Sequence, residues 1–194
     1  MSMAVVAGIY AGDWDRLEVP EGYRSEVIIG ELVVSPSGPP SHGTMQSAMA
    51  AVFLAAVPPG LIVLTDTEWR VALGGIVAAA PRPDVLVVAA VDIADDVVLT
   101  STPVLAVEIV SPSDFHPLER ASRSRIDAKR EDHARNGLRH YLEVSLTPDR
   151  VVRLDLHELR DNRLALSASA EGAIALDVDE PFAFRVVPEE LLQF

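Results

Sequence analysis

Two acidic side chains stand beside apolar runs, where a charge is costly. Asp84 opens the run of residues 85–88, and Glu108 lies inside the aliphatic run of residues 103–110. An ionised carboxylate among aliphatic side chains costs several kcal/mol unless a cation or a set of donors compensates it. Two carboxylates that converge repel each other, and a hard divalent cation such as Mg²⁺ relieves that repulsion. The pair is therefore a candidate for half of a hydrolytic metal site.

The single lysine of the chain is a third candidate residue for this hydrolytic site. Lys129 is the only lysine among 16 lysine and arginine residues. Arginine is the default basic residue in this composition, so a retained lysine hints at a role that arginine cannot fill. A compact ammonium whose pKa can fall on burial can orient or help deprotonate a water, whereas guanidinium is larger and stays protonated. The alternative is an ordinary solvated lysine on a helix.

Secondary structure must bring these residues together. Both apolar runs are short and rich in β-branched residues, which predicts strands. Alternation places Ala106, Glu108 and Val110 on one strand face. If the two strands are antiparallel neighbours, Asp84 lies opposite the end of the second strand, near Glu108. The two carboxylates would then converge at one end of the sheet.

A helix is predicted behind these strands, over residues 118–136. Asp114 can cap it, and Gly137 is placed for a left-handed terminus. Ile126, Lys129 and His133 fall at positions i, i+3 and i+7, so they share one helix face. Since Ile126 should direct this face toward the sheet, Lys129 is expected to point at Glu108.

The remaining pattern predicts an α+β chain. A hairpin turns at Gly30 between strands at 23–29 and 31–35, and a helix capped by Ser41 follows a proline-rich loop and ends before residues 58–60. Further strands are expected at 61–64, 68–73, 141–144, 151–156, 164–168 and 173–178. Helical turns are expected at 12–17 and 188–192. We expect one domain over residues 1–194, with residues 1–11 flexible.

Composition limits the classes of function. A chain of 194 residues with 49% hydrophobic residues suits one globular domain. It has no apolar run long enough for a membrane span and nothing resembling a secretory signal, so we expect no membrane partner. The absence of cysteine excludes disulfides and thiolate zinc sites, and a cytoplasmic location fits.

The net charge of −13 argues against a nucleic-acid partner, because basic side chains supply most phosphate affinity. Around the predicted helix the charge balance reverses. Seven basic and four acidic residues cluster in this segment, which gives a local charge of about +3. A basic ridge on an acidic body is one interpretation. A solvated helix face with i,i+4 ion pairs is the other.

Several of these segments together carry a family resemblance. They are Pro83-Asp84, the strand ending Glu108-Ile109-Val110-Ser111-Pro112-Ser113, then Asp127-Ala128-Lys129, Gly137 and Tyr141. Over about residues 20 to 180 the chain resembles the Uma family (Uma-two), named as "putative restriction endonucleases", in the PD-(D/E)XK nuclease-like superfamily. The resemblance implies a restriction-endonuclease-like mixed β-sheet core flanked by helices, with an N-terminal β-hairpin, and often a homodimer.

The resemblance also implies roles for individual residues. Asp84 and Glu108 match the acids that ligate Mg²⁺, with Mn²⁺ as a substitute, and the Ile109 carbonyl is a further candidate ligand. Val110 stands where the superfamily has its lysine, so Lys129 becomes the substitute. Three more residues are candidate accessory positions: Glu31, His42 and Asp127. Departures from the family occur at Ile29, His133, Leu142 and Ser145, and none removes an expected metal ligand.

These expectations lead to a principal function and two alternatives. The principal one is a Mg²⁺-dependent endonuclease that hydrolyses phosphodiester bonds of DNA through Asp84, Glu108 and Lys129. The first alternative, from another class, is a catalytically weak or inactive interaction or regulatory protein, with Glu108 in a buried ion pair and Asp84 a strand cap. The second alternative is hydrolysis of another phosphate ester by the same metal site.

Overall fold

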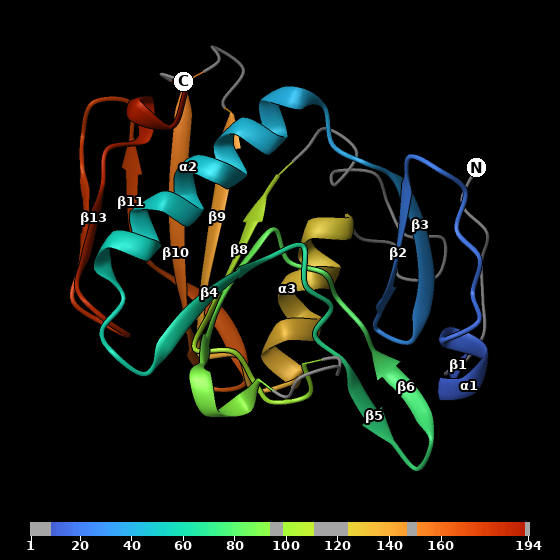
Figure 1. Cartoon of the computed structure of the whole chain (residues 1–194). Coiled ribbons are helices and arrows are strands. Elements are labelled where there is room, and N and C mark those ends of the chain that lie inside the picture. Colours follow the sequence, from blue (N-terminus) through green and yellow to red (C-terminus); the bar gives the residue numbers. More distant parts are fainter. Residues whose placement is uncertain (1–8, 94–98, 111–123, 147–150, 193–194) are drawn as a thin grey trace.

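The computed structural model describes residues 9–93, 99–110, 124–146 and 151–192. Its centre is a six-stranded sheet in the order β11-β10-β9-β8-β7-β4 (Figure 1). The strands are β4 (Leu61–Thr65), β7 (Val85–Ala89), β8 (Leu105–Ile109), β9 (His140–Leu146), β10 (Val152–Arg160) and β11 (Arg163–Glu171). Neighbours are antiparallel except β8 and β9, which are parallel. This mixed sheet with few helices confirms the predicted α+β class.

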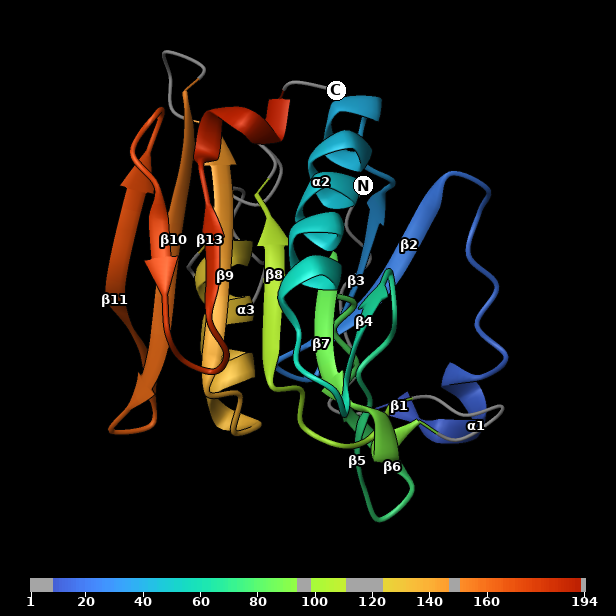
Figure 2. The same ribbon diagram turned by 60° about the vertical axis from the view of Figure 1, so that its left-hand side comes forward.

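Two helices cover opposite faces of the sheet (Figure 2): α2 (Pro40–Ala56) and α3 (Arg125–Arg135). Alternation along β7 sorts its side chains between them. Val85 and Val87 are in the buried cluster of the α2 face, together with Phe53. Leu86 and Val88 are in the cluster of the opposite face. The buried strands thus read as continuous apolar runs because both faces are covered.

The predicted N-terminal hairpin is present and lies against α3. It consists of β2 (Tyr23–Ile28) and β3 (Glu31–Pro36), and Ile28 and Val33 are buried with Ala128 of α3. Its two turn residues, Ile29 and Gly30, have φ angles of 50° and 70°. Two successive positive φ angles match a type I′ turn, whose twist suits a tight hairpin.

Smaller elements complete the chain. One three-stranded sheet has the order β1-β6-β5, from β1 (Ile9–Tyr10), β5 (Val71–Leu73) and β6 (Ile76–Ala79). The others are α1 (Ala11–Trp14), η1 (Ala90–Asp92), the pair β12 (Leu176–Val178) and β13 (Phe184–Val186), and η3 (Pro188–Leu192). Neither β6 nor β13 was predicted from the sequence. Within the segment 1–11 that was expected to be flexible, Ile9 and Tyr10 pair with β6, and residues 1–8 lie outside the described residues.

Both helix starts differ from expectation. Pro39 is the N-cap of α2, so Ser41 lies inside the helix and does not cap it. Ser124 is the N-cap of α3, and its side chain accepts from the Asp127 amide. The predicted cap Asp114 falls outside the described residues. At the other end, Gly137 has a φ of 80°, as its predicted role requires. No helix in the described ranges is both long and apolar enough to span a membrane.

Candidate active site

Asp84 and Glu108 lie on neighbouring strands, as the sequence predicted. β7 and β8 are antiparallel with Val85 opposite Val107, and one further step of this register sets Asp84 opposite Glu108. The Asp84 amide donates to the Val107 carbonyl at 3.0 Å. By alternation both side chains belong to the α3 face, together with Leu86 and Ala106. The two carboxylates therefore share one face and one end of the sheet.

Asp84 is fully buried and held from three sides. Its Oδ2 accepts the Ile109 amide at 2.7 Å and lies 3.3 Å from Nε2 of His42, while Oδ1 accepts from Nη1 of Arg24 at 3.2 Å. Burial alone would raise the pKa of Asp84, but the His42 hydrogen bond and the charges of His42, Arg24 and Lys129 outweigh it and lower the pKa. Asp84 is therefore kept as an anion. The hydrogen bond to Asp84 raises the pKa of His42 in turn.

Glu108 meets the lysine of α3. Nζ of Lys129 lies 3.1 Å from Oε1 and 3.0 Å from Oε2 of Glu108. Nε2 of His133 lies 3.7 Å from Oε1. Burial is the main reason that the pKa of Glu108 is raised, and the nearby Asp84 and Glu26 charges add to it, against the Lys129 charge. Glu108 is thus the member of the pair that takes up a proton more readily.

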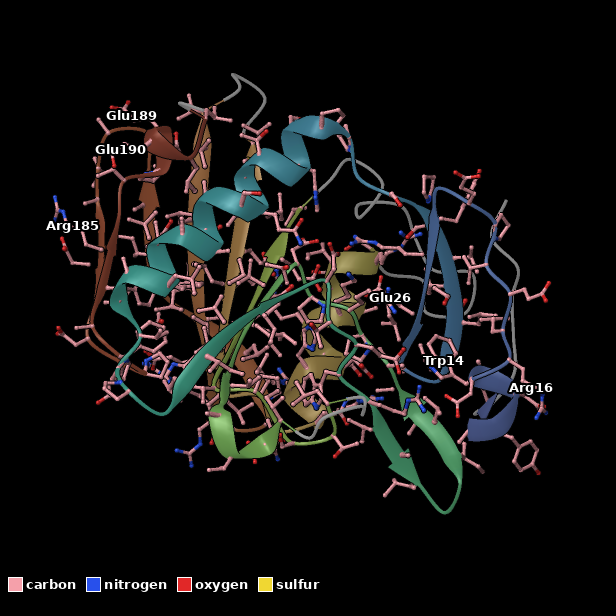
Figure 3. All side chains as sticks on the ribbon, viewed as in Figure 1. Trp14, Arg16, Glu26, Arg185, Glu189 and Glu190 are labelled. Atoms are coloured by element: carbon pink, nitrogen blue, oxygen red, sulfur yellow. The ribbon has the colours of Figure 1, made fainter. Side chains whose placement is uncertain are left out.

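Lys129 bridges two glutamates and is itself 1% exposed. Its Nζ lies 3.0 Å from Oε1 of Glu26 on β2, and this same oxygen accepts the Arg82 amide at 3.0 Å. Burial raises the pKa of Glu26, but Lys129, Arg24 and the Arg82 amide together lower it overall. Figure 3 shows Glu26 between the hairpin and α3. The hairpin thus completes the surroundings of the lysine.

The next residue of α3 anchors the helix to the sheet. Arg130 donates from Nε to Glu143 Oε1 at 2.9 Å and from Nη2 to Glu143 Oε2 at 2.9 Å. Glu143 is the β9 partner of Glu108 in the parallel register. Consecutive basic residues of α3 therefore reach acids on consecutive strands, an arrangement that fixes both the rotation and the height of the helix. A bidentate arginine pair gives such geometric control.

His133 completes the helix face that carries Ile126 and Lys129. All three side chains are buried, as the i, i+3, i+7 spacing predicted. The His133 ring stacks on Trp69 at a centroid distance of 5.8 Å and lies 5.1 Å from the Tyr141 ring. Because two aromatic rings fix the imidazole, its position beside Glu108 is defined by packing.

The structure sorts the remaining candidates. His42 contacts Asp84 directly, and the amide of Ile109 binds the same carboxylate. Glu31 is buried on the hairpin face that also carries Glu26, because Ile28 pairs with Glu31 and Glu26 with Val33. Asp127 does not join the site. Its carboxylate is 54% exposed, accepts from Ser124 and pairs with Arg130, so it belongs to the helix N-terminus.

Arg24, Glu26 and Gln46 are site residues that the sequence did not reveal. Arg24 and Glu26 alternate on β2, and Gln46 of α2 donates to the Asp84 carbonyl at 2.8 Å. Glu108 was identified as an acid among apolar strand residues. Glu26 shows the same pattern more weakly, since it only precedes the apolar residues Val27 and Ile28. The polar residues before it hide that signal, because they suggest a strand that is open to solvent.

The proposed basic ridge around α3 is not supported. Lys129 is buried, Arg130 binds Glu143, and Arg135 pairs with Glu131 at i,i+4. Arg120 and Arg123 fall outside the described residues. These three basic residues are therefore buried or ion-paired, and Arg135–Glu131 is a pair of the i,i+4 kind that the alternative interpretation expected.

A pocket of about 530 Å³ opens beside Asp84. Arg24, His42 and Gln46 line it and also contact Asp84. A second pocket of about 290 Å³ shares three lining residues with the first: Tyr23, Arg24 and Arg82. Asp84 itself is fully buried, and its contacts Arg24, His42 and Gln46 separate it from the larger pocket.

Two of three comparisons with known proteins found a match. Residues 12–183 match the Uma2 family, described as "Putative restriction endonuclease". A solved structure from Anabaena variabilis ATCC 29413, described as "a putative nuclease belonging to DUF820", has a TM-score of 0.68 at 15% identity. The match covers 95% of this chain and 98% of that chain, so the two share a fold. No curated protein matches. Since the family match spans most of its length, this chain belongs to the Uma family of restriction endonuclease-like proteins.

Proposed function

We propose that this protein is a Mg²⁺-dependent endonuclease that hydrolyses phosphodiester bonds of DNA. The observation that carries the proposal is the juxtaposition of Asp84, Glu108 and Lys129. Two buried carboxylates stand opposite each other on antiparallel strands, and the chain's only lysine reaches one of them from α3. Membership of a family described as restriction endonucleases supports the same class of reaction.

The site's charge balance fits a divalent cation. Three buried carboxylates, Glu26, Asp84 and Glu108, face two cationic side chains, Lys129 and Arg24. One negative charge is left for a proton, for protonated His42 or for a metal ion to compensate. Asp84 and Glu108, with the Ile109 carbonyl, are the residues that would hold Mg²⁺, for which Mn²⁺ can substitute. Hard oxygen donors of this kind suit either ion.

Bound Mg²⁺ would supply Lewis-acid polarisation of the scissile phosphate and would acidify a water. The chain's own residues do the rest. Asp84 stays anionic because Arg24, His42 and the Ile109 amide stabilise its charge. Lys129 orients the attacking water or exchanges a proton with it, and Glu26 fixes Nζ in place for that purpose. Glu31 is an outer acid of the hairpin face, and His42 positions Asp84.

The carboxylate oxygens are already engaged in this structure. Both Glu108 oxygens contact Lys129, and the Asp84 oxygens contact Arg24, His42 and the Ile109 amide. Within the described ranges, no group of three or more acidic or histidine side chains is arranged to hold an ion. Binding Mg²⁺ therefore requires Lys129 or Arg24 to give up a carboxylate oxygen. The proposal also includes a homodimer, by analogy with the superfamily, and a cytoplasmic location.

The second candidate is an interaction or regulatory protein with little catalysis. The same engaged oxygens favour it, because Lys129 can serve as a permanent internal cation for Glu108. The net charge of −13 favours it too. In that case the protein keeps the nuclease-like fold but has little catalytic activity.

Calorimetric titration separates the two candidates. The wild-type protein is titrated with Mg²⁺ and with Mn²⁺, and Asp84→Ala is titrated in parallel. The endonuclease predicts one site that disappears in the variant, together with nicking of supercoiled plasmid that also disappears. Arg185→Ala, an exposed substitution at the far edge of the molecule (Figure 3), should retain both. A wild-type protein with no ion affinity and no nicking would support the interaction protein.

A further inference from the structure

The two pockets beside Asp84 form one groove with an unusual composition for this acidic chain. They share the lining residues Tyr23, Arg24 and Arg82, so they adjoin each other at the N-terminal end of β2. His42 adds basic character to the larger pocket, and Asp66 is its one acidic lining residue. In the smaller pocket the acids Asp15 and Glu68 are both bound by Arg70, at 2.8 Å and 2.7 Å. Three arginines and three acids line the two pockets together, so their formal charges balance before His42 is counted, on a protein of net charge −13.

Two arginine nitrogens in this groove lack partners. The Nε atoms of Arg24 and Arg82 are buried, and neither has a hydrogen-bond partner among the described residues. Arg82 keeps 37% of its side chain exposed, and its contact to Glu68 is a distant 3.9 Å. A buried donor without an acceptor is costly, so a ligand that draws either guanidinium group toward the groove would supply the acceptor that its Nε lacks. Phosphate oxygens are acceptors that guanidinium groups bind well.

An aromatic side chain stands at the junction of the two pockets. Tyr23 lines both, and 49% of it is exposed. Exposed aromatic rings beside basic side chains are the platforms on which single-stranded nucleic acids stack their bases. A base on Tyr23 and a phosphate on Arg82 would match the two chemical halves of a nucleotide.

The shape of the groove selects between kinds of nucleic acid. Proteins that read a duplex usually insert a protruding helix or ribbon into its grooves and neutralise many phosphates. Here the basic residues line concave pockets of about 530 Å³ and 290 Å³. Unpaired bases can enter such pockets, whereas a stacked duplex presents its bases inward.

We propose that this groove binds a single-stranded segment of nucleic acid and leads its backbone to Asp84. Arg24 and Arg82 each bind a phosphate, and Tyr23 stacks a base between them. Arg24 joins the groove to the site because its Nη1 already contacts Asp84. The inference rests on the proposed function and narrows its substrate to strands that are unpaired at the groove.

Fluorescence anisotropy in EDTA tests the inference without cleavage. The probe is a labelled single-stranded DNA dodecamer, compared with a hairpin duplex of the same sequence. The single strand should bind more tightly, with a salt slope of about −1.4 for two phosphate contacts. Arg82→Ala should weaken binding about tenfold and reduce the slope to about −0.7, and Arg82→Lys should restore most of the slope. Tyr23→Ala should weaken binding about tenfold or more, while Tyr23→Phe retains it.

Arg185→Ala is the matched control, since it removes an exposed arginine from β13, far from the groove (Figure 3). Duplex binding as tight as single-strand binding would overturn the inference. So would Arg82→Ala and Tyr23→Ala variants that bind like the control. Cleavage is measured separately with Mg²⁺. Binding of the single strand without cleavage would refute the proposed endonuclease activity but not the proposed binding groove. Asp84-dependent cleavage, with unchanged affinities in both groove variants, would refute the binding groove alone.

Discussion

Lys129 holds Glu108 almost symmetrically, with its Nζ 3.1 Å from one carboxylate oxygen and 3.0 Å from the other. The side chains of both residues are almost fully buried. The ammonium therefore compensates the buried charge of Glu108, as a bound metal ion would otherwise do. This relationship connects the fold's stability to its proposed chemistry, because the same lysine must both compensate a buried charge and serve a reaction.

Removing that ammonium should destabilise the fold. Lys129→Met keeps the apolar stem and leaves Glu26 and Glu108 without their cation, so the free energy of unfolding at pH 7 should fall by about 3–5 kcal/mol. Urea denaturation measures the change. Arg185→Met, at a side chain 64% exposed, should stay within about 0.5 kcal/mol of wild type. A Lys129→Met variant as stable as this control would show that the buried carboxylates do not depend on the lysine.

Arginine should not replace the lysine. Lys129→Arg keeps the charge, but the larger planar guanidinium must fit where a side chain 1% exposed touches two glutamates. Overpacking of this kind costs about 1–3 kcal/mol. Plasmid nicking with Mg²⁺ should be lost, because guanidinium stays protonated. Retention of wild-type nicking by Lys129→Arg would exclude proton exchange at this position.

Gly38 should control the position of His42. A Cβ atom built on Gly38 would lie 2.6 Å from the His42 Cγ, so alanine there must push the imidazole away from Asp84. Gly38→Ala should reduce nicking roughly tenfold to a hundredfold, because it misplaces the Asp84 carboxylate that the proposed function makes catalytic. Gly43→Ala is the matched control, because its Cβ would meet nothing within 4 Å. It lies in α2 and should stabilise the protein by about 0.4–1 kcal/mol. Equal activity of both variants would contradict a positioning role for His42.

Asp132 should make stability depend on pH. Burial is the main cause that raises its pKa from 3.8 to about 6, and the Glu26 charge adds to it, against His133, Arg135 and the hydrogen bond from the Ile29 amide. A raised pKa means that the folded state binds the proton more tightly, so this group's contribution to stability falls as pH rises from about 4 to about 6. The loss should be about 1–3 kcal/mol.

Replacement of Asp132 by asparagine should remove this pH dependence of stability. Asp132→Asn keeps an acceptor for the Ile29 amide, 3.0 Å away, and discards the charge. It should be more stable than wild type at pH 7 and should flatten the stability profile between pH 4 and 6. Asp132→Ala also discards the charge but loses the acceptor, so it should be less stable than Asp132→Asn at every pH. Identical profiles for wild type and Asp132→Asn would refute the assignment.

The sequence predicted that Lys129 would meet Glu108 because strand and helix periodicities are local rules. Alternation set Glu108 on the face that proved to bear α3, and the i, i+3, i+7 spacing set Lys129 on the buried side of that helix. The same geometry explains why Asp127 lies apart from the other candidate residues. Two residues before Lys129 on a helix is about half a turn away, so its side chain points outward, and it is 54% exposed.

Glu26 could not be predicted by such rules. Its partner Lys129 lies about a hundred residues away, and their contact depends on how the hairpin docks against α3. No periodicity within β2 encodes that docking. The missed strand β6 has another cause, since Ile76–Ala79 follows two glycines and precedes alanines, a composition with weak strand preference. Ser124 as the cap of α3 was overlooked because basic residues precede and follow it in the sequence.

The most direct test of the account is a crystal of the protein soaked in Mn²⁺ and measured at the manganese absorption edge. The account predicts one anomalous peak bound by the carboxylates of both Asp84 and Glu108, and no peak there in Asp84→Ala. A saturating soak that leaves Lys129 on Glu108 with no manganese at either acid would contradict it.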